Sequence, residues 1–182
     1  MRLISNALPI CAGLLALVVT GEDKKDPPAP ASDRVGFPAG YRETFQEVRF
    51  FNRTNEQQVV TIYENARAAS VKQISDLPYP YGSIVVMETA SALRDAQGKP
   101  VSAADGRYAK DKVVGLHVAR REKGFGEAYG TNRAGEWEYV EYQADQGYRT
   151  PPAKSFACAK CHVEAGAERD FVYRGRFPEK GK

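Results

Sequence analysis

Two cysteines and a histidine near the carboxyl end of the chain have a spacing that suits covalent attachment of a porphyrin. They form the run Cys158-Ala159-Lys160-Cys161-His162, a C-x-x-C-H pattern typical of c-type haem attachment. If this run is helical, Cys158, Cys161 and His162 share one face, because a helix has about 3.6 residues per turn. The sequence therefore predicts one covalent haem c, with two thioether bonds and His162 as the proximal iron ligand.

The same C-x-x-C spacing occurs in thioredoxin-like redox pairs and in zinc sites. The chain has three cysteines and two histidines, so a zinc site here would lack ligands. No thioredoxin-like pattern surrounds the motif. A purely structural module would require the motif to be fortuitous. Haem attachment is therefore the favoured interpretation.

The amino-terminal segment predicts export from the cytoplasm. Residues 1–20 contain Arg2, then a charge-free and mostly apolar stretch, and a charged cluster follows at 22–25. This pattern is typical of a signal peptide. A retained membrane anchor is the less favoured alternative, because the apolar stretch reaches at most the ~20 residues that span a bilayer. We expect a periplasmic protein, and cleavage would remove Cys11 and leave the two motif cysteines.

Composition divides the remaining chain into two parts. Residues 21–38 contain several prolines and no apolar periodicity, and are expected to form a disordered linker. Residues 39–178 have the composition of one globular domain that is long enough to bury a core. The net charge is +3, and basic and acidic residues are interleaved, so the sequence predicts no nucleic-acid partner.

Four segments rich in β-branched and aromatic residues predict strands: 59–63, 83–89, 112–119 and 136–142. A short helix is expected over 66–71, capped by Asn65, and another after Pro151-Pro152. The predicted fold class is α+β of mainly antiparallel β type: a twisted antiparallel sheet with short helices and a haem-bearing C-terminal helix. The glycine-rich stretch 124–130 is interpreted as a connection between strands, because it opens no helix.

Two further side chains are candidates for the distal side of the haem. Apart from Met1 and His162, the chain has one methionine, Met87, and one histidine, His117. Thioether and imidazole groups are frequent second axial ligands of haem iron. The alternatives are that Met87 fills the core and that His117 is a hydrogen-bonded strand residue, on one face with Val113. Four aromatic residues are candidates for pocket walls or for ordinary packing: Tyr79, Tyr81, Phe125 and Trp137.

Several segments, in this order, resemble the cytochrome P460 family and its cytochrome c-prime-beta relatives. They are 82–88, 115–116, 135–139, the haem motif and 170–173, within residues 40–177. The resemblance implies a mainly antiparallel β domain, usually a homodimer, with one haem held by the two cysteines and the proximal histidine. Family members bind or transform small nitrogen compounds such as nitric oxide and, in some members, hydroxylamine.

The chain departs from the hydroxylamine-oxidising members at three positions. Met87 stands where those members have a lysine cross-linked to the porphyrin, and a thioether cannot form that bond. Val60 stands in the place of a distal arginine, and His117 in that of an acidic pocket residue. The resemblance therefore disfavours hydroxylamine oxidation.

Two functions remain open at this point. In the first, Met87 lies beside the iron, and the distal position binds nitric oxide, a related nitrogen oxide or peroxide. His117 then acts as a hydrogen-bond donor or as a peroxidase-like acid and base. In the second, the Met87 sulfur binds the iron opposite His162, giving an electron-transfer centre. The open distal face usual in the family favours the first. A small gaseous ligand and a redox partner protein are the expected partners.

Overall fold

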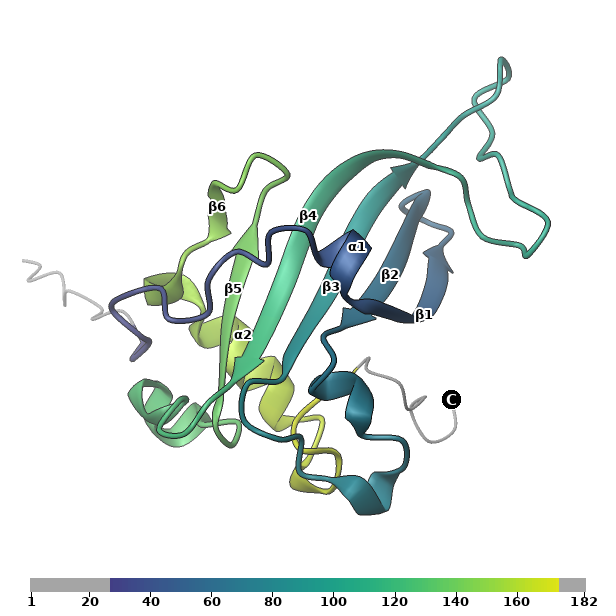
Figure 1. Ribbon diagram of the computed structural model, residues 1–182. Coiled ribbons are helices and arrows are strands. Elements are labelled where there is room, and N and C mark those ends of the chain that lie inside the picture. Colours follow the sequence, from purple (N-terminus) through teal and green to yellow (C-terminus); the bar gives the residue numbers. More distant parts are fainter. Residues whose placement is uncertain (1–26, 174–182) are drawn as a thin grey trace, which may run out of the picture.

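A six-stranded antiparallel sheet forms the centre of the part of the chain that the computed structural model describes, residues 27–173. The strand order follows the chain, so each strand pairs with its neighbour in sequence (Figure 1). The strands are β1 (Gln46–Arg53), β2 (Gln58–Glu64), β3 (Ile84–Ala92), β4 (Lys110–Arg121), β5 (Trp137–Tyr142) and β6 (Tyr148–Thr150). The predicted mainly antiparallel fold with short helices is confirmed.

The helical elements are short. The two α-helices are α1 (Tyr41–Thr44) and α2 (Phe156–Val163). The 3-10 turns are η1 (Ala68–Ser70), η2 (Ile74–Asp76), η3 (Glu127–Asn132), η4 (Pro152–Lys154) and η5 (Ala167–Arg169). Asn65 accepts a hydrogen bond from the Ala68 backbone at 2.9 Å, so the helix predicted over 66–71 is a single capped turn. Within residues 27–173, no helix is long and apolar enough to cross a bilayer.

The two strands that the sequence analysis did not predict lie at the two edges of the sheet. The register of β1 shifts between Glu47 and Arg49, which interrupts the alternation that would mark a strand. β6 has three residues, and its sequence is largely polar. Edge strands are often short, charged or bulged, and such features weaken their signal in the sequence.

The sheet has a core on each face. One face packs against α2, and residues 33–45 cross the other (Figure 1). The cluster on the α2 face includes Ile62, Val85, Trp137, Tyr139 and Ala159. The cluster on the opposite face includes Val35, Val86, Leu116, Val140 and Tyr142. The side chains of β5 alternate between the two clusters, with Trp137 and Tyr139 on the α2 face and Val140 and Tyr142 on the other.

A β-bulge changes the predicted facing of one residue in β4. Gly115 pairs with Thr89, but the next pair joins Val113 to Ala90, so one residue of β4 is extra. Val113 therefore packs into the cluster on the face opposite α2. The prediction that Val113 shares a face with His117 is wrong for this reason.

The predicted linker over 21–38 makes specific contacts in the part that the structure describes. Asp33 accepts a hydrogen bond from the Tyr142 hydroxyl at 2.6 Å. Arg34 forms an ion pair with Glu138, whose side chain is 1% exposed. These polar contacts hold residues 33–34 against the sheet, although the composition of the segment gives no sign of it. The predicted signal peptide, residues 1–20, lies outside the described residues.

Glu88 is a buried carboxylate on the face that residues 33–45 cross. It accepts hydrogen bonds from the Tyr41 hydroxyl and, at 2.7 Å each, from Arg42 and Lys110. Burial by itself would raise the pKa of Glu88. The hydrogen bonds and the positive charges of its partners outweigh burial and hold the pKa below its ordinary value.

We expect the free energy of unfolding to decrease as the pH falls below about 4.5, the ordinary pKa of this carboxyl. The folded pKa is lower than the unfolded one. The stabilisation by Glu88 is therefore complete above the unfolded pKa and is lost as the pH falls through the folded pKa. In Glu88→Gln, the free energy of unfolding measured with urea should depend less steeply on pH between about pH 7 and pH 3. The exposed Glu56→Gln is the control. Equal slopes in wild type and Glu88→Gln would contradict this assignment.

Candidate functional site

A cavity of about 580 Å³ lies between α2 and the sheet. Sites for cofactors and small ligands typically have volumes of about 300–1,000 Å³. Strands β1 to β4, helix α2 and the segment after η5 all contribute to its walls. The lining residues are Arg53, Ile62, Val85, Met87, His117, Ala119, Ala157, Cys158, Cys161, His162, Val172 and Tyr173.

Helix α2 brings the motif side chains to one side, as the spacing predicts. Cys158, Cys161 and His162 all line the cavity. The helix is anchored on its other side, where Ala159 is fully buried in the core. At its start, the buried Ser155 hydroxyl lies 2.8 Å from the Tyr129 hydroxyl. The anchored helix therefore holds the two thiols and the imidazole toward the cavity.

The His162 ring is fixed by a hydrogen bond and by stacking. Its Nδ1 lies 2.6 Å from the Phe171 carbonyl oxygen. Because a carbonyl can only accept, Nδ1 carries the proton, and Nε2 of the neutral ring has a free lone pair. The Tyr139 ring stacks on the imidazole with the centroids 4.2 Å apart. Burial, and to a smaller degree His117, lowers the pKa of His162 to about 3, so the ring is in the neutral form that binds metals.

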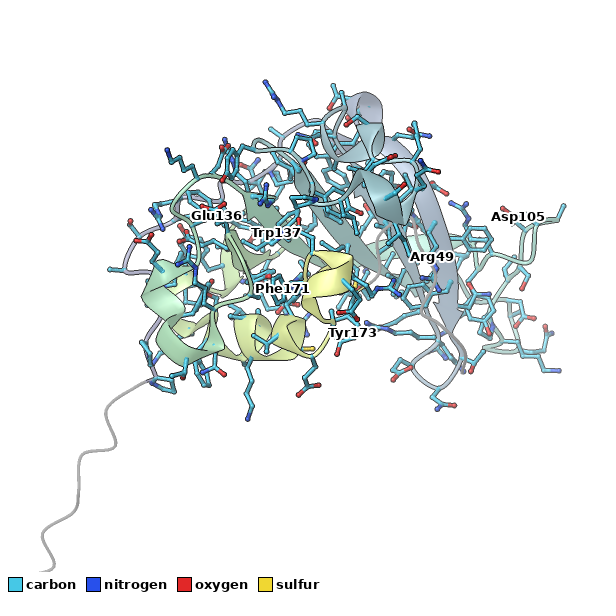
Figure 2. All side chains as sticks on the ribbon, turned by 90° about the horizontal axis from the view of Figure 1, so that it is seen from below. Arg49, Asp105, Glu136, Trp137, Phe171 and Tyr173 are labelled. Atoms are coloured by element: carbon cyan, nitrogen blue, oxygen red, sulfur yellow. The ribbon has the colours of Figure 1, made fainter. Side chains whose placement is uncertain are left out.

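The Phe171 carbonyl is held in place by an unusual backbone. Asp170 and Phe171 have φ values of 47° and 60°, in the left-handed region that few side chains adopt. The buried Asp170 carboxylate accepts a hydrogen bond from the Tyr79 backbone at 2.9 Å and faces the Arg121 guanidinium at 3.3 Å. Figure 2 shows Phe171 and Tyr173 on the same side of the sheet as α2. The bond to His162 therefore depends on contacts with the loop before β3 and with β4.

Met87 and His117 form a cross-strand pair on the cavity side of the sheet. Both were predicted as distal-side candidates, and the structure brings them together. The two Nε2 atoms of His117 and His162 are 3.4 Å apart. Burial lowers the pKa of His117 to about 4, so this imidazole is also neutral at ordinary pH.

Arg53 also lines the cavity, and the sequence analysis did not single it out. It lies at the end of β1, one of the two strands that were missed. Phe51 packs into the core on the α2 side, and residues two apart on a strand share a face. That relation to Phe51 is the signal in the sequence that could have identified Arg53. Val60, which is expected from the resemblance to replace a distal arginine, is fully buried in the same core.

The four aromatic residues considered as pocket walls do not line the cavity. Tyr79 and Trp137 pack edge to face in the core with their ring centroids 5.6 Å apart. Tyr81 is 42% exposed, and Phe125 lies beneath the Arg34 guanidinium. Tyr139, which stacks on His162, is the aromatic residue in closest association with the motif.

The residues present fit a thioether-linked porphyrin. Two thiols three positions apart and an imidazole with its lone pair on Nε2 border a cavity whose other walls are mostly apolar. A zinc site is not supported, because no cluster of three or more His, Cys, Asp or Glu side chains that could hold a metal ion occurs in residues 27–173. The side chains around the motif therefore suit haem better than the alternatives that use the same C-x-x-C spacing.

The comparison with known families agrees with this geometry. The family described as Cytochrome P460 matches residues 38–174, which cover the whole sheet, α2 and the segment that contacts His162. No curated protein matches the chain.

We expect Gly135→Ala to disturb the support of His162. A Cβ atom at position 135 would lie 2.9 Å and 3.0 Å from two atoms of the Phe171 ring. The variant should lose about 1–3 kcal/mol more of the free energy of unfolding than Gly98→Ala, measured by urea unfolding. Gly98 is a matched control, because it also has a positive φ but nothing lies within 4 Å of its Cβ position. An equal loss in the two variants would show that Phe171 is not tightly packed there.

Proposed function

The chain belongs to the cytochrome P460 family, a family of haem proteins, and on that basis we propose that it is a mono-haem c-type cytochrome. In this proposal Cys158 and Cys161 form the thioether bonds, and His162 is the proximal iron ligand. The observation that carries it is the placement of all three side chains on one cavity wall by α2.

When bound, the haem would supply an iron centre that can bind a small ligand or exchange electrons. The chain's own residues set the surroundings of that centre. The hydrogen bond from His162 to the Phe171 carbonyl orients the imidazole. It also makes Nε2 a more basic ligand, which donates its electron pair to a metal more strongly. Side chains such as Ile62, Val85 and Ala119 give the cavity wall on the sheet an apolar surface.

For the distal side we propose binding or transformation of a small ligand: nitric oxide, a related nitrogen oxide or peroxide. The support is the composition of the cavity wall on the sheet, where His117 and Arg53 stand among apolar residues. An apolar pocket with a few polar groups is the usual form of a small-ligand site. Arg53 can donate hydrogen bonds to an anionic oxygen, and His117 can donate to a ligand or accept a proton from it.

Met87 argues against hydroxylamine oxidation by this chain. It lines the cavity. The resemblance aligns it with the cross-linking lysine of the hydroxylamine-oxidising members, and its thioether has no amine for such a bond. Its presence in the cavity wall favours a second candidate function, electron transfer by a six-coordinate centre with His162 and Met87 as axial ligands.

The cellular setting is part of the same proposal. Covalent haem attachment outside the cytoplasm agrees with the signal-like pattern of residues 1–20. We propose a periplasmic location, a redox partner protein that exchanges electrons with the haem, and a homodimer as is usual in the family.

Haem attachment is tested by expression in cells that mature c-type cytochromes. The denatured protein should keep its haem stain on a gel and have the mass of the polypeptide plus one haem. Cys158→Ala combined with Cys161→Ala should abolish both signals, whereas Lys160→Ala, at an exposed position of the same helix, should keep them. A colourless wild-type protein without added mass would refute the proposal.

Ligand binding is tested by adding nitric oxide to the reduced protein. We expect a shifted absorption spectrum and the electron paramagnetic resonance signal of a nitric-oxide adduct. Arg53→Ala should lower the affinity for an anionic or polar ligand more than Arg94→Ala does. Arg94 is the control, because it lies outside the cavity. Absence of an adduct in wild type, together with a sulfur-to-iron charge-transfer band, would favour the electron-transfer function instead.

A further inference from the structure

The two imidazoles in the cavity face each other through the same ring atom. His117 comes from β4 and His162 from α2, and the Nε2 atoms are 3.4 Å apart. The ring centroids are 5.5 Å apart, and the ring planes differ by 6°. Because the nitrogens are much closer than the centroids, the rings meet edge to edge, with each Nε2 directed at the other.

The protonation of this pair follows from the neighbours of His162. Its Nδ1–H donates to the Phe171 carbonyl, so its Nε2 has a lone pair directed at His117. Without a metal, His117 must hold its proton on Nε2 to complete the hydrogen bond. If a metal ion occupied the His162 Nε2, that proton would have no acceptor there. The other neutral tautomer of His117, with its proton on Nδ1, would then present its Nε2 lone pair toward the metal.

Met87 is the other candidate for this position, and its surroundings are different. It pairs directly with His117 in the sheet and also lines the cavity. It packs, however, against the apolar cluster on the α2 face, as a side chain that fills the core does. It is the His117 Nε2 that contacts the His162 Nε2 directly.

The spacing of the two nitrogens is close to what a shared metal ion requires. Imidazole nitrogens bind zinc at about 2.0–2.1 Å, so two of them on opposite sides of one such ion stand about 4 Å apart. The nitrogens here are 3.4 Å apart. The distance between the nitrogens would have to increase by about 0.6–0.8 Å to reach the shared arrangement, and the cavity beside the rings gives them room to move.

We propose that His117 is the second axial ligand of the haem iron in the resting protein, and that a small distal ligand binds by displacing it. This inference rests on the haem attachment proposed above. In this arrangement His117 competes with the small ligand for the same position. The ligand therefore binds only the fraction of molecules in which His117 has moved away. With that fraction at about 1–10%, binding is weakened about 10- to 100-fold relative to an open site.

The experiment is spectroscopy of the oxidised holoprotein with two matched variants of the cross-strand pair. We expect a low-spin six-coordinate spectrum in wild type and in Met87→Leu, without a sulfur-to-iron charge-transfer band. His117→Ala should be high-spin, and added imidazole should return it to low-spin. A high-spin wild type would overturn the proposal, and so would a Met87→Leu protein that becomes high-spin. Haem staining of each variant shows that the haem is attached, and His117→Gln serves if His117→Ala fails to fold.

Nitric oxide separates this inference from the proposed ligand-binding function. His117→Ala should bind nitric oxide at least about tenfold more tightly than wild type. Equal affinities would overturn displacement of His117 and leave the binding function standing. If neither protein binds nitric oxide while wild type is low-spin and His117→Ala is high-spin, ligation by His117 stands and nitric oxide binding fails.

Discussion

The hydrogen bond between the His162 imidazole and the Phe171 carbonyl determines the chemistry available in the cavity. A carbonyl accepts but cannot donate, so the bond leaves the Nε2 lone pair directed toward the sheet. It depends on two consecutive residues in the left-handed region and on the Asp170 carboxylate, which the Tyr79 backbone and Arg121 hold. Contacts far from the motif in sequence therefore decide how the motif histidine points.

The cavity and the opposite face of the sheet differ in their polar side chains, although Arg53 also lines the cavity. On one face, neutral imidazoles and mostly apolar side chains border the cavity. On the other, the buried Glu88 is paired with Arg42 and Lys110, and Glu138 is paired with Arg34. Buried charges are tolerated only with such partners, and here the partners come largely from the segment that crosses that face.

Local patterns explain how much of this arrangement could be predicted. The spacing of Cys158, Cys161 and His162 on a short helix needs only helical periodicity, and the alternation in β5 needs only strand periodicity. The bulge that turns Val113 over depends on pairing with β3, which the sequence of β4 does not reveal. The approach of His117 to His162 joins residues 45 positions apart and depends on how α2 docks on the sheet. Arg53 was missed because its edge strand was missed.

The sequential order of the strands also has a consequence for how the chain folds. Each strand pairs with the strand before it, so the sheet can grow by successive pairing of neighbouring strands. The contacts that close long loops come from the two ends of the described chain: Arg34 with Glu138, 104 residues apart, and Tyr79 with Asp170, 91 residues apart. The loop-closure entropy of this fold is thus concentrated in two terminal segments, one on each face of the sheet.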